Sequence, residues 1–502
     1  MGEAALPVKH KGLLTLAVMG ASIIQILDST IANVAIPHMQ TSLGATQDSV
    51  TWVLTSYIIA SAVSIPITGW LSDRIGSRRL FLLAVTGFII TSMLCGAATN
   101  LTQMVIFRIF QGICAAFIGP LSQTILLDIN SPERAPKAMA MWGMGIMVAP
   151  ILGPVIGGWL TESYNWRWVF YINLPIGIPT LLLLWWLLPS RALVRRRLDL
   201  LGFSMLAIGL ATLQLMLDRG QHVDWFQSWE IWIECLIAVS ALWMFLIQQF
   251  TAEKPMFSRS LIGNRNFITA LGFMVLIGMM MFGIFALFPP MLQSLFGYTV
   301  LDTGLLLAPR GVGILASMFI ASRLTGKLDA RIIVATGFIL TAYSLWEMTQ
   351  WSLEMDWHPI VLTGLIQGLG MGFVFIPMNA LAFATLAPDL RTDGSSLLYL
   401  LRSLGGSMGI SVMTATLARN IQVSHEDLAG HVTAYSMSSV DPSSADRLGS
   451  AGEAALRILD GEITRQAAMI AYLDDFMLMM FAVLVCIPFV LLLRPASPPQ
   501  AR

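Results

Sequence analysis

Long apolar stretches, separated by short polar connections, follow one another along nearly the whole chain. A helix that crosses a bilayer needs roughly 20 predominantly apolar residues, and fourteen stretches reach about that length. They run at 13–36, 50–71, 80–99, 104–127, 138–160, 168–188, 199–218, 229–250, 268–291, 303–325, 332–351, 359–384, 397–418 and 475–493. The pattern predicts an all-α polytopic membrane protein with 14 transmembrane helices.

Basic residues gather in every second connection between these stretches. The intervening connections hold almost none, with Arg167 and Arg219 as exceptions. Because basic connections remain in the cytoplasm, and an even number of spans leaves both termini on one side, we expect both termini to be cytoplasmic. The basic positions are Lys9, Lys11, Arg74, Arg78, Arg79, Arg134, Lys137, Arg191, Arg195, Arg196, Arg197, Lys254, Arg259, Arg265, Arg323, Lys327 and Arg331.

Composition narrows the class of protein further. Of 502 residues, 56% are hydrophobic and 12% are charged, which is too apolar for a soluble domain. The net charge is zero, so nothing indicates a nucleic-acid partner. The four cysteines lie in apolar stretches without metal-ligand spacing or a disulfide framework. We find no nucleophile–base pair and no metal-type histidine motif, and therefore expect no enzyme, no cofactor, no metal and no cleaved signal peptide.

A faint internal repeat relates the two ends of the chain. Equivalent residues recur at a constant separation of 256 positions, as between Gln111 and Gln367 or between Asp73 and Asp329. We therefore predict an N-terminal six-helix bundle (1–190), a two-helix insert with cytoplasmic linkers (191–265), and a C-terminal six-helix bundle (266–502). Two such halves with a central site are a transporter architecture.

One outer connection, residues 419–474, is much longer than the others. Its first part is rich in Ser, Gly and Asp and is typical of a flexible loop. Its second part places apolar residues at helical spacing and predicts an amphipathic surface helix. The connection either docks a partner protein or is a solvated loop without one. The apolar positions are Leu456, Leu459, Ile463, Ala467 and Ile470.

Asp28 is an ionisable residue deep inside the first apolar stretch. Carboxylates at membrane depth are costly and face the interior of the bundle, and Gln25 and Ala32 share its helical face. We predict a proton or cation site, against the alternative of a polar contact that holds two helices together. Arg108 in the fourth stretch is the expected partner, unless it extends to a membrane interface.

Two glycine-containing segments are candidates for gating. Residues 69–79 form a connection that contains Asp73. The carboxylate of Asp73 can pair with an arginine in one conformation and lose that pair in another, which would act as a latch; the alternative is an ordinary solvated loop. The fifth stretch carries small residues at four-residue spacing, which allow close helix approach, and two prolines that can bend the helix. The gating residues are Gly69, Asp73, Arg74, Gly76, Arg78, Gly145, Pro150, Gly153, Pro154 and Gly157.

Further polar residues lie inside apolar stretches. Glu347 is either a second proton or cation site or a contact near the outer interface, whereas Glu234 in the insert is expected to be structural. Arg310 and Arg402 are either structural or contacts for anionic substrates. We predict a substrate cavity lined by Gln25, Asn33, Gln111, Arg310, Gln367, Asn379 and Arg402.

These motifs together resemble the major facilitator superfamily, in particular its fourteen-helix drug:proton antiporter branch of EmrB/QacA type. The similar segments are 27–37 in the first span, 69–79, 108–112, the antiporter motif at 143–158, and 166–177. Residues 217–220 and 224–226 are most similar to the EmrB members of that branch. The second-half loop at 326–331 departs from the superfamily pattern.

The resemblance implies a proton-driven antiporter that exports amphipathic drugs and toxic compounds across the inner membrane of a Gram-negative bacterium. It also implies a tripartite efflux system with a periplasmic adaptor protein and an outer-membrane channel. The expected partners are small-molecule substrates, protons and membrane lipid. The alternatives are a narrow exporter of an endogenous metabolite, such as a fatty acid or siderophore, an intramembrane enzyme, and a receptor that transports nothing.

Overall fold

The computed structural model describes residues 6, 8–131, 134–190, 193–194, 196–325, 328–384, 386–432 and 450–493. Throughout these residues the chain is helical, apart from connections and one isolated bridge between Thr325 and Leu328. The prediction of an all-α membrane fold is confirmed. Arg191, Arg195, Lys327 and positions 433–449 of the predicted outer connection lie outside the described residues.

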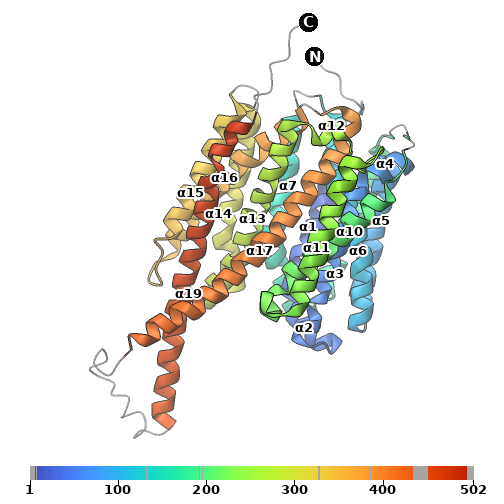
Figure 1. The fold of residues 1–502 in the computed structure, drawn as a ribbon. Helices are drawn as coiled ribbons and strands as arrows, with labels where there is room; N and C mark the ends of the chain where they lie inside the picture. The colour runs from blue at the N-terminus through green and yellow to red at the C-terminus, as the bar shows by residue number, and fades with distance from the viewer. Residues whose placement is uncertain are drawn as a thin grey trace.

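The N-terminal half consists of long helices joined by short helical segments, and a two-helix insert follows it (Figure 1). The segments of this half are α1 (Lys11–Leu43), α2 (Gln47–Val50), α3 (Trp52–Ser64), η1 (Ile65–Ile67), α4 (Thr68–Ile75), α5 (Ser77–Ala97), α6 (Leu101–Ile129), α7 (Ala135–Ser163), α8 (Trp168–Tyr171) and α9 (Asn173–Leu187). The insert consists of α10 (Leu200–Arg219), η2 (Gly220–Val223), η3 (Trp225–Gln227) and α11 (Trp229–Thr251).

The C-terminal half begins with a short helix and ends in a 3-10 turn. Its elements are α12 (Arg259–Ile262), α13 (Arg265–Ser294), α14 (Val300–Leu324), α15 (Ala330–Met348), α16 (Trp357–Ala384), η4 (Pro388–Leu390), α17 (Arg391–Gly430), α19 (Ser450–Cys486) and η5 (Pro488–Leu492). Of the helices in the described residues, eleven are long and apolar enough to cross a membrane. Three more bundle helices, α7, α15 and α17, coincide with predicted spans, so the count of fourteen remains a prediction.

The two halves repeat one packing scheme. In the first half α1 packs on α7, α3 on α6, and α5 on both α6 and α9. In the second half α13 packs on α17, α14 on α16, and α15 on both α16 and α19. This is the order that duplication of a six-helix unit would produce. The residue boundaries that we predict for the halves and the insert are not fixed by this packing.

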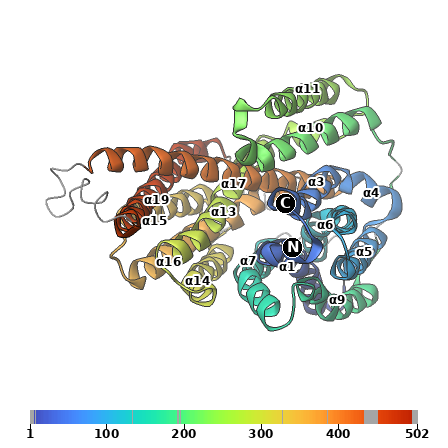
Figure 2. The same ribbon diagram turned by 90° about the horizontal axis from the view of Figure 1, so that it is seen from below.

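The insert lies outside both bundles. Figure 2 shows α10 and α11 as a separate layer, and α10 packs against α3 while α11 packs on α10. Large apolar side chains cover the outer surface of α11; Trp229 is 82% exposed and Leu236 is 70% exposed. An exposed surface of this kind is suited to lipid rather than to water.

The predicted outer connection differs from the structure at both of its ends. Residues 419–430 continue α17, and α19 already begins at Ser450, so much of the connection is an extension of two helices beyond the bundle (Figure 1). Polar contacts join these extensions: His425 Nε2 lies 3.1 Å from Asp460 Oδ1, and Asn420 Nδ2 lies 3.5 Å from Asp474 Oδ2. The predicted amphipathic helix is present, but as part of α19.

Candidate functional site

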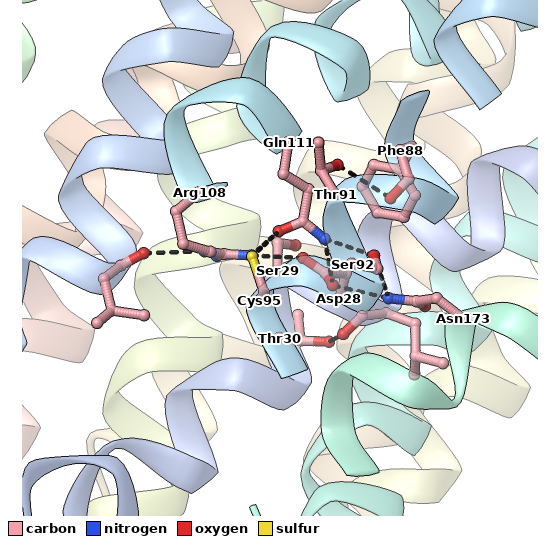
Figure 3. A network of polar contacts seen from close by, with 12 residues as sticks. Asp28, Ser29, Thr30, Phe88, Thr91, Ser92, Cys95, Arg108, Gln111 and Asn173 are labelled. Atoms are coloured by element: carbon pink, nitrogen blue, oxygen red, sulfur yellow. Dashed lines mark hydrogen bonds and ion pairs between the residues drawn. The ribbon is translucent and has the colours of Figure 1, made fainter. Parts of the chain in front are cut away.

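Asp28 and Arg108 meet in the interior of the N-terminal half (Figure 3). Arg108 Nη1 of α6 lies 2.6 Å from Asp28 Oδ2 of α1, and both side chains are completely buried. Arg108 is fixed further by donating from Nε to the carbonyl of Val53 at 2.9 Å and by stacking over the ring of Tyr57. The structure thus brings together the two residues that the sequence paired, and it excludes an Arg108 that extends to a membrane interface.

Two amides complete the surroundings of the Asp28 carboxylate. Gln111 Nε2 donates to Asp28 Oδ1 at 2.9 Å, and Asn173 Nδ2 of α9 donates to the same oxygen at 2.8 Å. Ser92 on α5 accepts from both amides, so four helices meet at this network. Because an ionised carboxylate only accepts hydrogen bonds, this arrangement suits the charged form of Asp28.

Two residues therefore have surroundings that the sequence did not predict. Gln111 was expected in a substrate cavity, but its side-chain amide forms hydrogen bonds with Asp28, Arg108 and Ser92. Asn173 was not predicted as a site residue, although it lies in the segment 166–177 that carries the family resemblance. An asparagine at the start of an apolar span is the signal that could have indicated it.

The other polar residues expected in the cavity are distributed over both halves. Gln25 on α1 exchanges hydrogen bonds with the hydroxyl of Tyr399 on α17, at 2.9 and 3.1 Å, and so joins the halves. Asn33 is exposed on α1. Asn379 is buried and donates to the carbonyl of Phe375 in its own helix. Arg402 is buried, with its guanidinium over the rings of Tyr399 and Phe375.

Arg310 is a buried guanidinium without a hydrogen-bond partner in the described part of the chain. It is 4% exposed, and none of its three side-chain nitrogens is bonded. Its guanidinium carbon lies 4.4 Å from the ring centroid of Phe288 and 5.9 Å from that of Phe285. Gln367, also buried, leaves both amide atoms unbonded. Buried polar groups are nearly always bonded, to protein, water or ligand, so these two residues stay candidates for the predicted substrate cavity.

Glu347 has a different environment from Asp28. It is only half-buried near the end of α15, and it accepts a hydrogen bond from the hydroxyl of Tyr343 on the same helix at 2.8 Å. This position fits the alternative of a contact near a membrane interface better than that of a buried proton site. Glu234, in the insert, is buried on α11.

The small-residue stripe of α7 packs against α1. A Cβ built on Gly153 would lie 2.2 Å from Thr30 Oγ1, and one on Gly157 would lie 2.7 Å from Ile31 Cγ1. Gly145 of α7 lies against Met19 of α1. α7 remains one helix through Pro150 and Pro154. The stripe thus holds α7 against the helix that carries Asp28.

Replacing Gly153 or Gly157 with leucine is expected to block transport while the protein still inserts in the membrane. Overpacking of this kind costs about 1–3 kcal/mol, and here it would separate α1 from α7. Transport by reconstituted protein is the measurement. Gly272→Leu is the matched control, because a Cβ on Gly272 meets nothing within 4 Å. Normal transport by both stripe variants would contradict a role for the α1–α7 contact.

Ion pairs join the halves at the end of the bundle where α1 begins and η5 finishes, which we call the terminus-proximal end (Figure 1). Arg196, in the linker before α10, lies 3.3 Å from Asp73 and 2.6 Å from Asp393 of α17. Burial alone would lower the pKa of Arg196, but the hydrogen bonds and charge of Asp393, with the charge of Asp73, raise it. Arg391 of α17 pairs with Asp128 of α6 at 3.2 Å.

The residues predicted for this latch divide into two groups. Gly69 lies directly against Asp393, where any Cβ would clash with the carboxylate. Gly76 adopts a left-handed φ of 92° at the turn between α4 and α5, which favours glycine. Arg74 stacks over Trp70, and Arg78 donates to the carbonyl of Trp185. The arginine that pairs with Asp73 is Arg196, one of several arginines that the sequence could not distinguish.

A cavity of about 260 Å³ lies where α10 of the insert meets α3 and α17. Polar side chains line much of it, and the hydroxyl of Thr55 donates to the Asp218 carboxylate at its edge. The hydroxyl of Ser411 on α17 donates to the carbonyl of Leu217 on α10 at 2.8 Å. The sequence did not indicate this cavity. Its polar lining residues are Gln214, Asp218, Gln221, His222, Ser407, Ser411 and Thr414.

Two similarly packed helical halves that meet at a central polar region define the chain as a polytopic membrane protein built like a secondary transporter. The sequence profile of the Major Facilitator Superfamily matches residues 18–410. The chain therefore belongs to the Major Facilitator Superfamily, and it is a transporter rather than an enzyme.

Several curated proteins are similar over most of their length. The Multidrug export protein EmrB of Haemophilus influenzae is 40% identical over 431 residues, with 84% of each chain covered. The Fatty acid resistance protein FarB of Neisseria gonorrhoeae is 36% identical, with 97% of each chain covered. EmrB of Escherichia coli is 36% identical over 96% of this chain and 95% of that protein.

A solved structure shows the same fold. The crystal structure of the human organic anion transporter MFSD10 (TETRAN) matches with a TM-score of 0.58 and 16% sequence identity, covering 94% of this chain and 99% of that chain. At this identity the likeness extends to the fold alone.

Proposed function

We propose that this chain is a proton-driven antiporter that exports amphipathic drugs and toxic compounds across the inner membrane of a Gram-negative bacterium, with both termini in the cytoplasm. The observation that carries the proposal is the Asp28–Arg108 pair, which is sealed from solvent inside the N-terminal half. The similar proteins named for multidrug export, EmrB of two bacteria, support the substrate class.

A proton on Asp28 would change the energy of this network. A neutral carboxyl no longer attracts the Arg108 guanidinium as an ion. The protonated oxygen becomes a donor that faces another donor, either Arg108 at Oδ2 or Gln111 and Asn173 at Oδ1. The network must therefore rearrange. One charge that crosses the membrane potential supplies about 2.3 kcal/mol per 100 mV, which is enough to shift an equilibrium between two conformations more than tenfold.

The packing of α1 offers a route from that change to the substrate path. α1 carries Asp28 and packs on α7 through Gly153 and Gly157. α7 in turn packs against α14 of the other half. A shift of α1 on protonation of Asp28 would thus reach the contact between the halves through α7.

The conformation described here is the one closed at the cytoplasmic end. The ion pairs of Arg196 with Asp393 and of Arg391 with Asp128 hold α17 against the first half at the terminus-proximal end. That end is the cytoplasmic one under the orientation that the basic residues predict. During export, these ion pairs would have to break when the predicted substrate cavity opens toward the cytoplasm.

A fatty-acid exporter is the second candidate, and one observation favours it. Arg310 is a buried cation that has no hydrogen-bond partner among the described residues, and it lies against phenylalanine rings. A carboxylate with an apolar tail would supply the missing charge and fill apolar space. The similarity to a protein named for fatty acid resistance agrees with this reading. We find no comparable observation for a siderophore.

Export by reconstituted protein distinguishes these functions. Proteoliposomes with an imposed pH gradient would be tested with three amphiphiles that share one alkyl tail but carry a cationic, a neutral or a carboxylate head. A multidrug antiporter moves at least two of the three and requires the gradient. Movement of the carboxylate alone supports the narrow exporter, and movement without the gradient contradicts proton coupling.

The helix extensions beyond the bundle are a candidate docking site for a periplasmic adaptor, which would itself engage an outer-membrane channel. Both extensions carry exposed apolar side chains: Val423 on α17 is 50% exposed and Ile458 on α19 is 75% exposed. These side chains lie in the segments that project from the bundle (Figure 1). Exposed apolar residues on a projecting helix pair suit contact with another protein.

Val423→Asp and Ile458→Asp are expected to lower drug resistance in cells at least several-fold while proton-driven transport in proteoliposomes stays normal. A new charge at a protein contact is costly, but on an exposed helix surface it leaves the fold intact. Gln422→Asp is the matched control, because it adds the same charge at an adjacent, exposed polar position. Unchanged resistance in both variants would remove the docking role.

A further inference from the structure

Asp475 on α19 is a completely buried carboxylate that neither the sequence motifs nor the Asp28 network uses. Its side chain is 0% exposed, and its Oδ1 lies 2.6 Å from Thr416 Oγ1 on α17. Its other oxygen, Oδ2, is buried and has no hydrogen-bond partner among the described residues. The predicted last span begins at residue 475, so the sequence placed this carboxylate at a boundary rather than in the interior.

Among the described residues, no cationic side chain forms an ion pair with this carboxylate. The titratable groups that act on it are Asp474, which is exposed, and Tyr472, which is buried; both lie on α19. The elements packed on α19 are α17, α15, η5 and α13, and within the described residues none of their basic side chains forms an ion pair with Asp475. Asp28, in contrast, has an arginine and two amides as donors.

The ionised form of Asp475 would be a buried negative charge next to a second carboxylate, and such a charge is strongly unfavourable in a membrane protein. A bound proton removes that cost. The contact to Thr416 accommodates it, because the hydroxyl of Thr416 can donate to the carbonyl of Val412 at 2.9 Å while it accepts from a neutral carboxyl. Thr416 then links the carboxyl to the backbone of α17.

We propose that Asp475 is a second proton-exchanging carboxyl, in the C-terminal half, which holds a proton while α17 and α19 are packed as described and releases it when they separate. Asp474, one residue earlier, is exposed and charged, so the proposal places Asp475 beside a polar surface from which a proton can be exchanged. α17 also carries Asp393 and Tyr399, which contact Arg196 and Gln25 outside the C-terminal half. Movement of α17 would therefore open Asp475 and the contacts between the halves together.

The exchange of a proton at Asp475 does not depend on the proposed export function. A role of that exchange in coupling proton flow to export rests on the proposed function. Infrared difference spectra of the full-length protein in lipid, recorded between acidic and alkaline buffer, test the exchange by itself. We expect a carboxyl C=O band that titrates in the wild type, vanishes in Asp475→Asn, and persists in the neighbouring control Asp474→Asn. A spectrum of Asp475→Asn identical to the wild type would overturn the proposal.

Thr416→Val provides a second test that leaves the carboxyl in place. Loss of the hydrogen bond from the carboxyl O–H to Thr416 should shift the same band, because that bond polarises the whole carboxyl group, its C=O bond included. Thr414→Val, two residues earlier on α17, is the control, since the hydroxyl of Thr414 bonds only backbone carbonyls of its own helix. A band unmoved by Thr416→Val, or moved equally by both variants, would show that Asp475 is not the titrating group.

Transport measurements then separate exchange from coupling. If Asp475 contributes to antiport, Asp475→Asn should lower the number of protons moved per substrate molecule, and Asp474→Asn should not. A lost infrared band with an unchanged proton-to-substrate ratio would overturn the coupling role while leaving the exchange in place. Loss of all proton movement in the wild type would instead contradict the proposed function.

Discussion

Asp28→Asn is expected to abolish proton-driven export and the proton release that substrate binding causes. Asparagine keeps the shape of the side chain but carries no exchangeable proton. It also leaves Arg108 buried without its counter-charge, at a cost of about 3–5 kcal/mol, so the melting temperature should fall as well. The measurement is the pH change in weakly buffered detergent solution when substrate is added, together with export in proteoliposomes.

A paired variant separates lost coupling from lost stability. Asp28→Asn combined with Arg108→Leu removes both buried charges, and this combination should recover much of the stability without recovering export. Binding of neutral substrates should largely survive in both variants, whereas binding of cationic substrates should weaken. Proton release and export by Asp28→Asn at the wild-type level would place the coupling site elsewhere, with Asp475 and then Glu347 to be tested next.

The Asp28–Arg108 contact could be predicted because few ionisable residues lie at membrane depth in the first half, and a buried charge needs a partner. The spans could be predicted because apolar length is a strong constraint in a membrane. Asn173 escaped prediction because an uncharged amide in an apolar span has no obligatory partner. Only the packing of α9 beside α1 reveals its role at Asp28.

Other features depended on position rather than on residue type. Arg196 is one of several arginines in one linker, and only the fold places it between Asp73 and Asp393. Residues 419–430 are polar enough to be typical of a loop, yet they remain helical because they pack against the extension of α19. The burial of Asp475 could not be predicted, because sequence hydropathy does not fix the first residue of a membrane span to within a few residues.

Arg310→Met is expected to raise the thermal stability of the ligand-free protein and at the same time to abolish export of amphiphiles with a carboxylate head. Within the part of the chain that the structure describes, the guanidinium of Arg310 is buried without a hydrogen-bond partner. Replacing it with an apolar residue of similar volume removes the cost of burying that charge, which is on the order of several kcal/mol. A hydrogen bond to a charged group contributes about 1.5–3 kcal/mol, so affinity for the carboxylate should fall roughly 10- to 100-fold.

The opposite signs of these two effects make the test specific. If Arg310 were purely structural, its substitution would lower the stability of the protein and would reduce the export of all substrates equally. Arg402→Met is the matched comparison, because Arg402 is equally buried but interacts with Tyr399, so its loss should not stabilise the protein. Thermal unfolding with and without a carboxylate amphiphile, and export of the three matched amphiphiles, are the measurements. Undiminished carboxylate export by Arg310→Met would show that the anionic head binds elsewhere, and the argument for a fatty-acid exporter would fail with it.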